Sequence, residues 1–344
     1  MKLEILPFQL PLKHTFTIAH QSRDIQDTLI VRLLGPDGLY GLGESTTNPY
    51  YGITIENMQA CLLKVADEVL SGLAPMHPEE LWKITQPYFK DNPFAQCALD
   101  IAAWDLYAKM QGKKLYELLD LNPAAIPVTN FTIGIAPIPK MIEKMKEVDW
   151  PIYKIKLGTD HDLDIIKSLR AHTDAVFRID ANCAWTADQA IAYSGELAKL
   201  NVEFMEQPLA REDNEGMKKV YRYSELPVIA DESCITEEDV SRCSGLFDGI
   251  NVKLVKAGGI TPGLRMLRQA KSMGMKTMVG CMTESSVGIA AIAHIAPLLD
   301  YVDMDGAMLL ARDIAEGVTI RTDGVEFPNR PGTGAVLIES PGVG

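Results

Sequence analysis

The chain has 344 residues, of which 47% are hydrophobic and 23% are charged, a composition typical of a soluble globular protein with one or two domains. Its formal net charge of −13 argues against nucleic-acid binding, because phosphates require basic surfaces. No apolar stretch approaches the ~20 residues that span a bilayer, and residues 1–12 lack the pattern of a signal peptide. The six cysteines form no CxxC pair, so we expect reduced thiols in a cytoplasmic protein.

Residues 1–122 predict a separate α+β domain. Strand-like runs occupy 3–11 and 28–34, and the turn Gly35-Pro36-Asp37-Gly38 joins the second run to 39–44 as an antiparallel hairpin. Helical patterns follow at 55–70, 78–89 and 94–110. We expect this domain to be completed by the Gly- and Pro-rich tail, 319–344.

Residues 123–318 alternate strands and helices. Such alternation predicts a parallel sheet, and eight strands at this spacing predict an α/β fold with a closed, TIM-like (β/α)8-type barrel. The predicted strands are 128–133, 152–157, 175–180, 202–206, 227–231, 249–253, 276–280 and 301–303.

Five charged residues recur at intervals of about 25 residues, and each one ends or directly follows a strand-like run: Lys156, Asp180, Glu206, Asp231 and Lys253. That interval is one strand plus one helix. Because side chains at the carboxyl ends of barrel strands converge on one site, we expect the five to be neighbours. The order of base, three acids and base predicts a divalent-metal site with a lysine on each side.

Asp180, Glu206 and Asp231 are the predicted metal ligands. A set made only of carboxylates selects a hard cation, which favours Mg²⁺ over Ca²⁺ or Zn²⁺. Each acid alone has an alternative interpretation as a helix cap or a surface charge. Only their repetition at three strand ends favours the metal.

Lys154 and Lys156 lie two residues apart in one strand, so both side chains point into the barrel mouth. Neighbouring cations lower each other's pKa, and a metal adds to this effect, which suits a general base. We predict that Lys156, nearer the strand end, is the base and that Lys154 holds a substrate carboxylate. The alternative is a solvated edge strand.

Lys253 ends the sixth predicted strand, whereas Lys156 lies on the second. These strands are opposite in an eight-stranded barrel, so a substrate between them would present one face to each lysine. The arrangement suits removal of a proton from one face and return of a proton to the other. Lys256 is a rival to Lys253, but it lies in a segment that the sequence predicts as a turn.

Asp303 and Asp305 share a face of the last strand. Two further carboxylates at the mouth suit an ammonium group, and the alternative is a cap or loop role. His294 lies in an apolar helix and is interpreted as a packed core residue.

Several motifs combine in one chain: Lys154-Ile155-Lys156, Asp180-Ala181-Asn182, Glu206-Gln207-Pro208, Ala230-Asp231-Glu232-Ser233, Lys253 with Gly258-Gly259, and Ala98-Leu99-Asp100 with Trp104-Asp105. Together they resemble the enolase superfamily, muconate-lactonising subgroup, over essentially the whole chain. The resemblance implies a capping α+β domain over a modified (β/α)7β barrel. It also implies removal of a proton α to a carboxylate, with one Mg²⁺ per subunit stabilising the enediolate.

Within the subgroup, Asp303-Met304-Asp305 resembles the dipeptide epimerases, especially those that act on L-Ala-D/L-Glu. The likeness implies that the two aspartates hold the α-ammonium group of a dipeptide. It also implies that Lys156 and Lys253 each handle one stereoisomer of the C-terminal residue. The further substrate contacts that it implies are Thr132, Lys154 and Cys281.

One position departs from the pattern of Ala-Glu epimerases that place an arginine in a first-domain loop to meet the glutamate side chain. The matching residue here is Thr17, and Arg23 is the nearby alternative. The side-chain preference therefore stays open.

The predicted function is an isomerase, a Mg²⁺-dependent dipeptide epimerase of cell-wall peptide recycling, with a homo-oligomer left open. Alternatives in the same subgroup are o-succinylbenzoate synthase, N-acylamino acid racemase and muconate cycloisomerase, whose reactions need no ammonium site. An alternative of another class is a non-catalytic metal-binding protein, which gives no reason for two opposed lysines.

Overall fold

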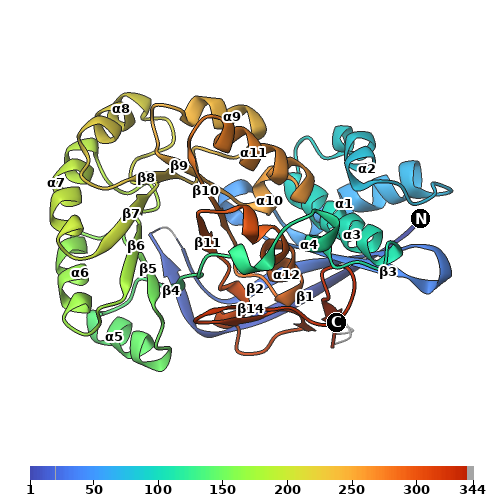
Figure 1. Cartoon of the computed structure of the whole chain (residues 1–344), viewed down its shortest axis with the longest axis horizontal. Coiled ribbons are helices and arrows are strands. Elements are labelled where there is room, and N and C mark those ends of the chain that lie inside the picture. The colour runs from blue at the N-terminus through green and yellow to red at the C-terminus, as the bar shows by residue number, and fades with distance from the viewer. Residues whose placement is uncertain (20, 339–344) are drawn as a thin grey trace.

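Eight parallel strands form the largest sheet of the structure, a computed structural model that describes residues 1–19 and 21–338 (Figure 1). Their order in the sheet is their order along the chain. The strands are β4 (Phe131–Ile133), β5 (Ile152–Lys156), β6 (Val176–Asp180), β7 (Val202–Glu206), β8 (Val228–Ala230), β9 (Gly249–Val252), β10 (Lys276–Gly280) and β11 (Tyr301–Asp303). The helices between them are α5 (Ile138–Glu147), α6 (Asp162–Arg170), α7 (Ala187–Ala198), α8 (Asn214–Tyr223), α9 (Glu237–Cys243), α10 (Leu254–Ala257), α11 (Ile260–Ser272) and α12 (Ser286–Ile295).

Side-chain hydrogen bonds join the first and last strands of this sheet. Asn130 Nδ2 donates to Asp303 Oδ1 at 2.7 Å, and the backbone N–H of Thr132 donates to Asp305 Oδ2 at 2.5 Å. These bonds nearly close the sheet into a barrel. Because no α-helix follows β11 in the described part of the chain, the predicted (β/α)7β architecture is confirmed.

Strand register sets which residues face the barrel interior. Lys156 on β5 lies beside Asp180 on β6, and Asp180 lies beside Glu206 on β7. Side chains alternate along a strand, so the intervening Ile155 and Ile179 point the other way, towards the helices, where they are fully buried. The charged residues are therefore neighbours because of the sheet's register.

A second, antiparallel sheet lies beside the barrel and is formed by β1 (Lys2–Ile18), β2 (Gln21–Leu34) and β3 (Tyr40–Thr46). Helix α3 packs directly on β3. Gly41 and Gly43 permit this approach, since a Cβ atom there would lie 1.9 Å and 2.0 Å from backbone oxygens of α3. The helices of this layer are α1 (Ile55–Val65) with a π-helical extension (Ala66–Leu70), α2 (Pro78–Thr85), α3 (Pro93–Met110) and α4 (Leu115–Leu118).

The hairpin of β1 and β2 is longer than the predicted strands 3–11 and 28–34. Its extra length reaches the barrel, where Ile135 N–H donates to Thr17 O at 2.9 Å. The register shifts between Pro11 and Phe16. Residues 12–19 and 21–27 are mostly polar and partly exposed, so the hydrophobic pattern carried no strand signal there.

Smaller differences concern element ends. The strands β8 and β9 stop one residue before Asp231 and Lys253, so both side chains follow their strands directly. Lys256 was expected in a turn, but it lies in the short helix α10. As expected, His294 is a buried core residue; its Nδ1 accepts from Tyr116 N–H at 3.0 Å.

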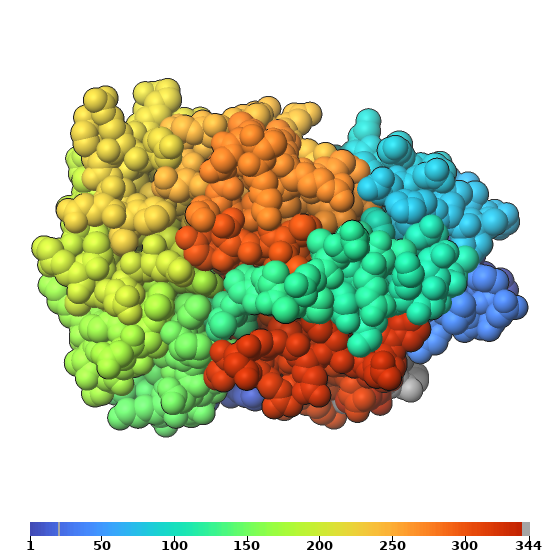
Figure 2. Space-filling view, viewed as in Figure 1, coloured from blue at the N-terminus to red at the C-terminus, as the bar shows by residue number. Residues whose placement is uncertain are grey.

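The C-terminal segment carries the short strands β12 (Ala315–Glu316), β13 (Thr319–Arg321), β14 (Gly324–Glu326) and β15 (Val336–Leu337). Figure 2 shows this segment, in red, beside the segment that leads from α3 towards the barrel. Gly332 exchanges backbone hydrogen bonds of 2.9 Å with Lys113 and Leu115. Residues 339–344 of the predicted tail lie outside the described residues, and the predicted domain boundary at 122/123 stays a prediction. Among the described residues, no helix is long and apolar enough to cross a membrane.

We expect Asp105→Ala to destabilise the fold strongly. The buried Asp105 carboxylate accepts from Leu42 N–H at 2.8 Å and Thr333 N–H at 2.7 Å, and so joins β3, α3 and the C-terminal segment. Each buried donor left without a partner costs about 1–3 kcal/mol. The apparent midpoint of urea unfolding should fall clearly.

The matched control is Glu143→Ala, whose ion pair with Lys140 is exposed. Its unfolding free energy should change by less than about 0.5 kcal/mol. Equal midpoints for the two variants would contradict the role given to Asp105.

Candidate active site

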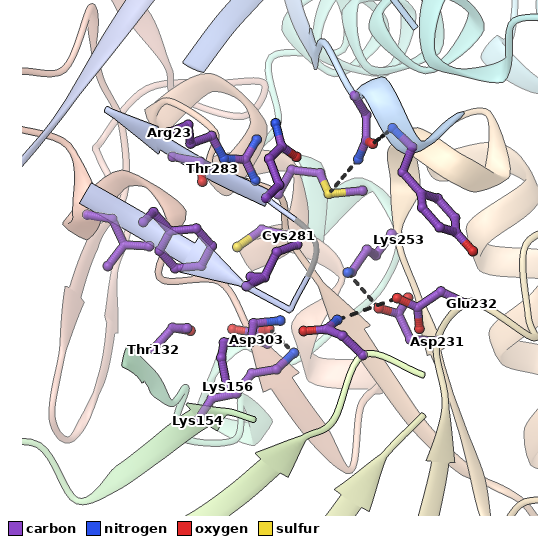
Figure 3. Close-up of a pocket in the computed structure, with 18 of the residues that line it drawn as sticks. Arg23, Thr132, Lys154, Lys156, Asp231, Glu232, Lys253, Cys281, Thr283 and Asp303 are labelled. Carbon is purple, nitrogen blue, oxygen red and sulfur yellow. Dashed lines mark hydrogen bonds and ion pairs between the residues drawn. The ribbon is translucent and has the colours of Figure 1, made fainter. Parts of the chain in front are cut away.

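The carboxyl ends of the barrel strands open into a cavity of about 430 Å³ (Figure 3). Barrel residues form its floor, and residues of the β1–β2 hairpin and the short turn Pro49–Tyr51 contribute to its walls. The extended hairpin thus supplies part of the site. All ten residues predicted from the sequence either line this cavity or lie directly against its lining residues.

Three carboxylates meet in the floor of this cavity. Asp180, Glu206 and Asp231 each offer an oxygen atom, and these atoms lie within 4.8 Å of one another. All three side chains are buried. The structure therefore brings the predicted metal ligands together, and their role as ligands stays a prediction.

The donor set fits a hard divalent cation. It consists of oxygen only, which suits Mg²⁺. Within the described residues, the buried Glu206 Oε2 has no hydrogen-bond partner of acceptable geometry, although Lys154 Nζ lies 2.7 Å away. At this distance the Lys154 ammonium group and the Glu206 carboxylate form an ion pair. Because Oε2 accepts no hydrogen bond from a described residue, one of its lone pairs is available to a metal.

Lysines from β5 lie on one side of the carboxylates. Lys156 Nζ donates to Asp180 Oδ2 at 2.6 Å. Lys154 Nζ lies 2.7 Å from Glu206, 2.8 Å from Asp303 and 3.2 Å from Asp180. Lys154 therefore connects the predicted metal ligands with the predicted ammonium site.

Two lysines that follow β9 lie on the other side. Lys253 Nζ donates to Asp231 Oδ2 at 2.7 Å. Lys256, the rival residue, is also part of this cluster: its Nζ donates to the backbone oxygen of Asp231 at 2.6 Å and contacts its carboxylate. Lys253 lines the cavity whereas Lys256 does not, so the geometry favours Lys253 as the group that meets a substrate.

The two candidate bases enter the cavity from different walls (Figure 3). In the order of the sheet, β5 is the second strand and β9 is the sixth. Three strands therefore separate β5 from β9 in either direction around the barrel. Lys156 and Lys253 therefore approach the space above the carboxylates from opposite sides.

Carboxylates raise the pKa of Lys154 and of Lys253. Burial alone would lower the pKa of Lys154, but Asp303 and other carboxylates outweigh burial and raise it well above its usual value. Similarly, Asp231 overcomes the effect of burial and raises the pKa of Lys253. Without a bound cation, the three carboxylates within 3.2 Å of Lys154 Nζ outweigh any lowering of its pKa by a neighbouring lysine, and the expected effect of the metal stays a prediction.

Asp303 and Asp305 form a second acidic group at the cavity wall. Burial would raise the pKa of Asp303, but Lys154 outweighs it and holds the pKa at about 2. Burial, followed by the charge of Asp303, raises the pKa of Asp305 to about 8. Thr132 and Cys281 line the same part of the cavity. A cation placed here would be held by at least one ionised carboxylate.

The reasoning from sequence missed other lining residues. Glu232 directly follows the predicted ligand Asp231, Asn182 lies two residues after Asp180, and both line the cavity. Asn251 Nδ2 donates to Glu206 Oε1 at 2.8 Å. Strand alternation from Lys253 could have identified Asn251, since the two residues are separated by one position.

Arg23, the alternative to an arginine at Thr17, lines the cavity from β2. Its guanidinium contacts the Gln26 side chain, and its Nε has no hydrogen-bond partner in the part of the chain that the structure describes. Burial lowers the pKa of Arg23. This end of the cavity therefore offers a positive charge.

Comparison with known proteins agrees with this geometry. A protein of Flavobacterium johnsoniae called L-Ala-D/L-amino acid epimerase is 55% identical over 98% of this chain and 100% of its own length. Among solved structures, a substrate-liganded complex of the L-Ala-D/L-Glu epimerase from Bacillus subtilis superposes with a TM-score of 0.90. It is 27% identical and covers 98% of this chain and 99% of its own.

A dipeptide epimerase from Enterococcus faecalis, complexed with Mg and the dipeptide L-Leu-L-Tyr, gives a TM-score of 0.89 at 30% identity, with 97% and 98% of the two chains covered. Two family models match as well. Residues 2–120 match the mandelate racemase / muconate lactonizing enzyme N-terminal domain, and residues 140–340 match the enolase C-terminal domain-like family. The predicted resemblance is thereby confirmed, and the chain belongs to the mandelate racemase / muconate lactonizing enzyme family of the enolase superfamily.

Proposed function

We propose that the protein is a Mg²⁺-dependent dipeptide epimerase that inverts the α-carbon of the C-terminal residue. The observation that carries the proposal is the placement of Lys156 and Lys253 on opposite sides of three clustered carboxylates, with Asp303 and Asp305 at the cavity wall. The relatives described above, which are dipeptide epimerases by name, support it.

Asp180, Glu206 and Asp231 would hold the metal. When bound, Mg²⁺ would fix the substrate carboxylate and neutralise the negative charge that develops on it after proton removal. Lys154, which lies between the metal ligands and Asp303, would contact the same carboxylate.

The two lysines would act as opposed proton carriers. One removes the α-proton from its face of the C-terminal residue, and the other delivers a proton to the opposite face. The opposite approach of Lys156 and Lys253 makes this exchange possible without turning the substrate over. In the reverse direction the roles of the lysines exchange.

Asp303 and Asp305 would hold the free ammonium group of the dipeptide, and Thr132 and Cys281 would line the space around its first residue. An ammonium ion donates strong hydrogen bonds to carboxylates, and two aspartates in one wall can accept them. Substrates without an ammonium group would form no ion pair with Asp303 and Asp305.

L-Ala-D/L-Glu is the first substrate to test, because the positive charge of Arg23 at the cavity suits an acidic side chain. Such a substrate would place the enzyme in recycling of cell-wall peptides. We also place the enzyme in the cytoplasm, which the six free cysteines support, and a homo-oligomer remains a proposal.

Replacing Lys156 or Lys253 by alanine should lower epimerisation at least about 100-fold, because each direction needs both proton carriers. Each variant should still exchange the α-proton of the single epimer that its remaining lysine serves. Deuterium uptake from heavy water into separate samples of L-Ala-D-Glu and L-Ala-L-Glu, followed by NMR, measures this.

The exposed Lys199 provides the control, and Lys199→Ala should leave both rates unchanged. Full epimerisation by both the Lys156→Ala and the Lys253→Ala variants would show that the two-lysine mechanism is wrong.

Asp305→Asn should raise the KM for dipeptides about 10- to 100-fold, since hydrogen bonds to charged groups contribute about 1.5–3 kcal/mol. In the wild type, KM should decrease as the pH is raised from 6 to 7.5. The reason is that the ionised fraction of Asp305, whose pKa is about 8, increases over this range. The variant should lose this dependence.

Turnover of an N-succinylated amino acid, which has no ammonium group, serves as the control substrate for Asp305→Asn. If the wild type prefers that substrate and the variant keeps its dipeptide turnover, the protein is one of the subgroup alternatives rather than a dipeptide epimerase.

Mg²⁺ should raise the thermal unfolding temperature of the wild type, because it would relieve repulsion among the buried carboxylates. At a concentration of 100 times Kd, linkage adds about 2.7 kcal/mol. Glu206→Gln should lose most of this shift, whereas Glu196→Gln, at an exposed position, should keep it. An equal shift in both variants would exclude Glu206 as a ligand.

A further inference from the structure

Asp100, a buried carboxylate of the first layer, contacts the barrel segment that carries Lys253. It lies on α3, and its oxygens accept from the backbone N–H of Thr261 at 2.8 Å and from the Thr261 hydroxyl at 2.7 Å. Thr261 is in the first turn of α11. The first N–H groups of a helix have no partner within the helix, and a carboxylate satisfies them well.

Two tryptophans of the same layer hold this segment further. Trp82 Nε1 donates to Gly258 O at 3.1 Å, and Trp104 Nε1 donates to the Thr261 hydroxyl at 2.9 Å. Gly259 adopts a φ of +121°, and a Cβ atom there would lie 2.3 Å from Asp100 Oδ2. Only glycine permits so close an approach of the backbone to Asp100.

The segment from Lys253 to Gly259 is a compact unit. The backbone oxygen of Lys253 accepts from Lys256 and Ala257 N–H at 3.0 Å, and Leu254 O accepts from Gly258 and Gly259 N–H at 2.9 Å. Such a short, internally bonded unit transmits a shift at one end to the other. A movement at Thr261 would therefore displace Lys253, whose side chain ends at the cavity.

We propose that Asp100 is a positioning residue that holds Lys253 at the distance its proton transfer requires. The inference rests on the two-lysine function proposed above. Among residues 1–19 and 21–338, no comparable chain of hydrogen bonds links Asp100 to Lys156, which lies on β5 within the barrel sheet. Loss of Asp100 should therefore affect one epimer of the substrate more than the other.

Glu44 offers a matched comparison on the next barrel helix. This buried carboxylate of β3 accepts from Ser285 N–H at 3.0 Å and Gly288 N–H at 2.9 Å, at the N-terminus of α12. The loop before α12 carries Cys281 and Thr283 but no proton-transfer lysine. Disturbing Glu44 should therefore not distinguish the two epimers through a lysine.

The test compares α-proton exchange of L-Ala-D-Glu and L-Ala-L-Glu in heavy water for four variants with bound Mg²⁺: Asp100→Ala, Asp100→Asn, Glu44→Gln and Lys253→Ala. Lys253→Ala identifies the epimer that Lys253 serves. Asp100→Ala should slow exchange of that epimer by about 10- to 100-fold, because a shift of about 1 Å can cost 100-fold in rate. Exchange of the other epimer should change by less than about 3-fold.

Asp100→Asn should restore most of the lost rate. Burial raises the pKa of Asp100 to about 7, and the amide has the same shape and keeps an acceptor for Thr261 N–H. If Asp100→Ala does not fold, Thr261→Val takes its place, since it removes only the hydroxyl bond and should give the same selectivity with a smaller change. Glu44→Gln should alter both epimers to a similar degree.

Equal losses for both epimers in Asp100→Ala, or in Thr261→Val, would overturn the inference and leave Asp100 with a role in stability alone. Absence of epimer selectivity in Lys253→Ala itself would overturn the proposed two-lysine function, and the inference would fall with it. The two failures are therefore distinguishable within one experiment.

Discussion

The compensation of buried like charges is the constraint on which the site depends. Three carboxylates lie within 4.8 Å of one another in a buried floor, where their repulsion is strong. Four lysines surround them, and each carboxylate has at least one ammonium group within 2.7 Å. Removing one partner of a buried ion pair is far more costly than the pair's net contribution, so the stability of this cluster depends on its lysines. The lysines that offset the charge of these carboxylates include Lys156 and Lys253, the two groups proposed above as proton carriers.

The first layer acts on this site in two ways. The β1–β2 hairpin extends over the barrel mouth and brings Arg23 to the cavity. At the other end of the cavity, the carboxylates Asp100 and Glu44 occupy the N-termini of α11 and α12. Because these helices follow the strands that lead to Lys253 and Cys281, the layer contributes to the cavity walls and also contacts the segments that carry these two lining residues.

The barrel and the central cluster could be predicted from sequence because both depend on short-range rules. The length of one strand plus one helix accounts for the interval between Asp180, Glu206 and Asp231. The alternation of side chains along a strand puts Lys154 on the same face as Lys156. The hairpin extension could not be predicted, because its two strands are mostly polar and pair with each other. Its contact with the barrel joins Thr17 to Ile135, which is far away in sequence. Lys256 was underrated because the short helix α10 depends on tertiary packing against α3. The ion pair between Lys154 and Asp303 could not be derived from strand alternation, because the two residues are far apart in sequence.

The central claim is that two different groups handle the two faces of the substrate. The most direct measurement starts from unlabelled L-Ala-D-Glu in heavy water and determines the α-label of product and of recovered substrate at low conversion. With two opposed lysines, the L-Ala-L-Glu product should carry deuterium at the α-carbon from the first turnovers, because its new proton comes from the lysine that did not remove the old one. A product that retains the original α-proton would show a single carrier on both faces and would contradict the account.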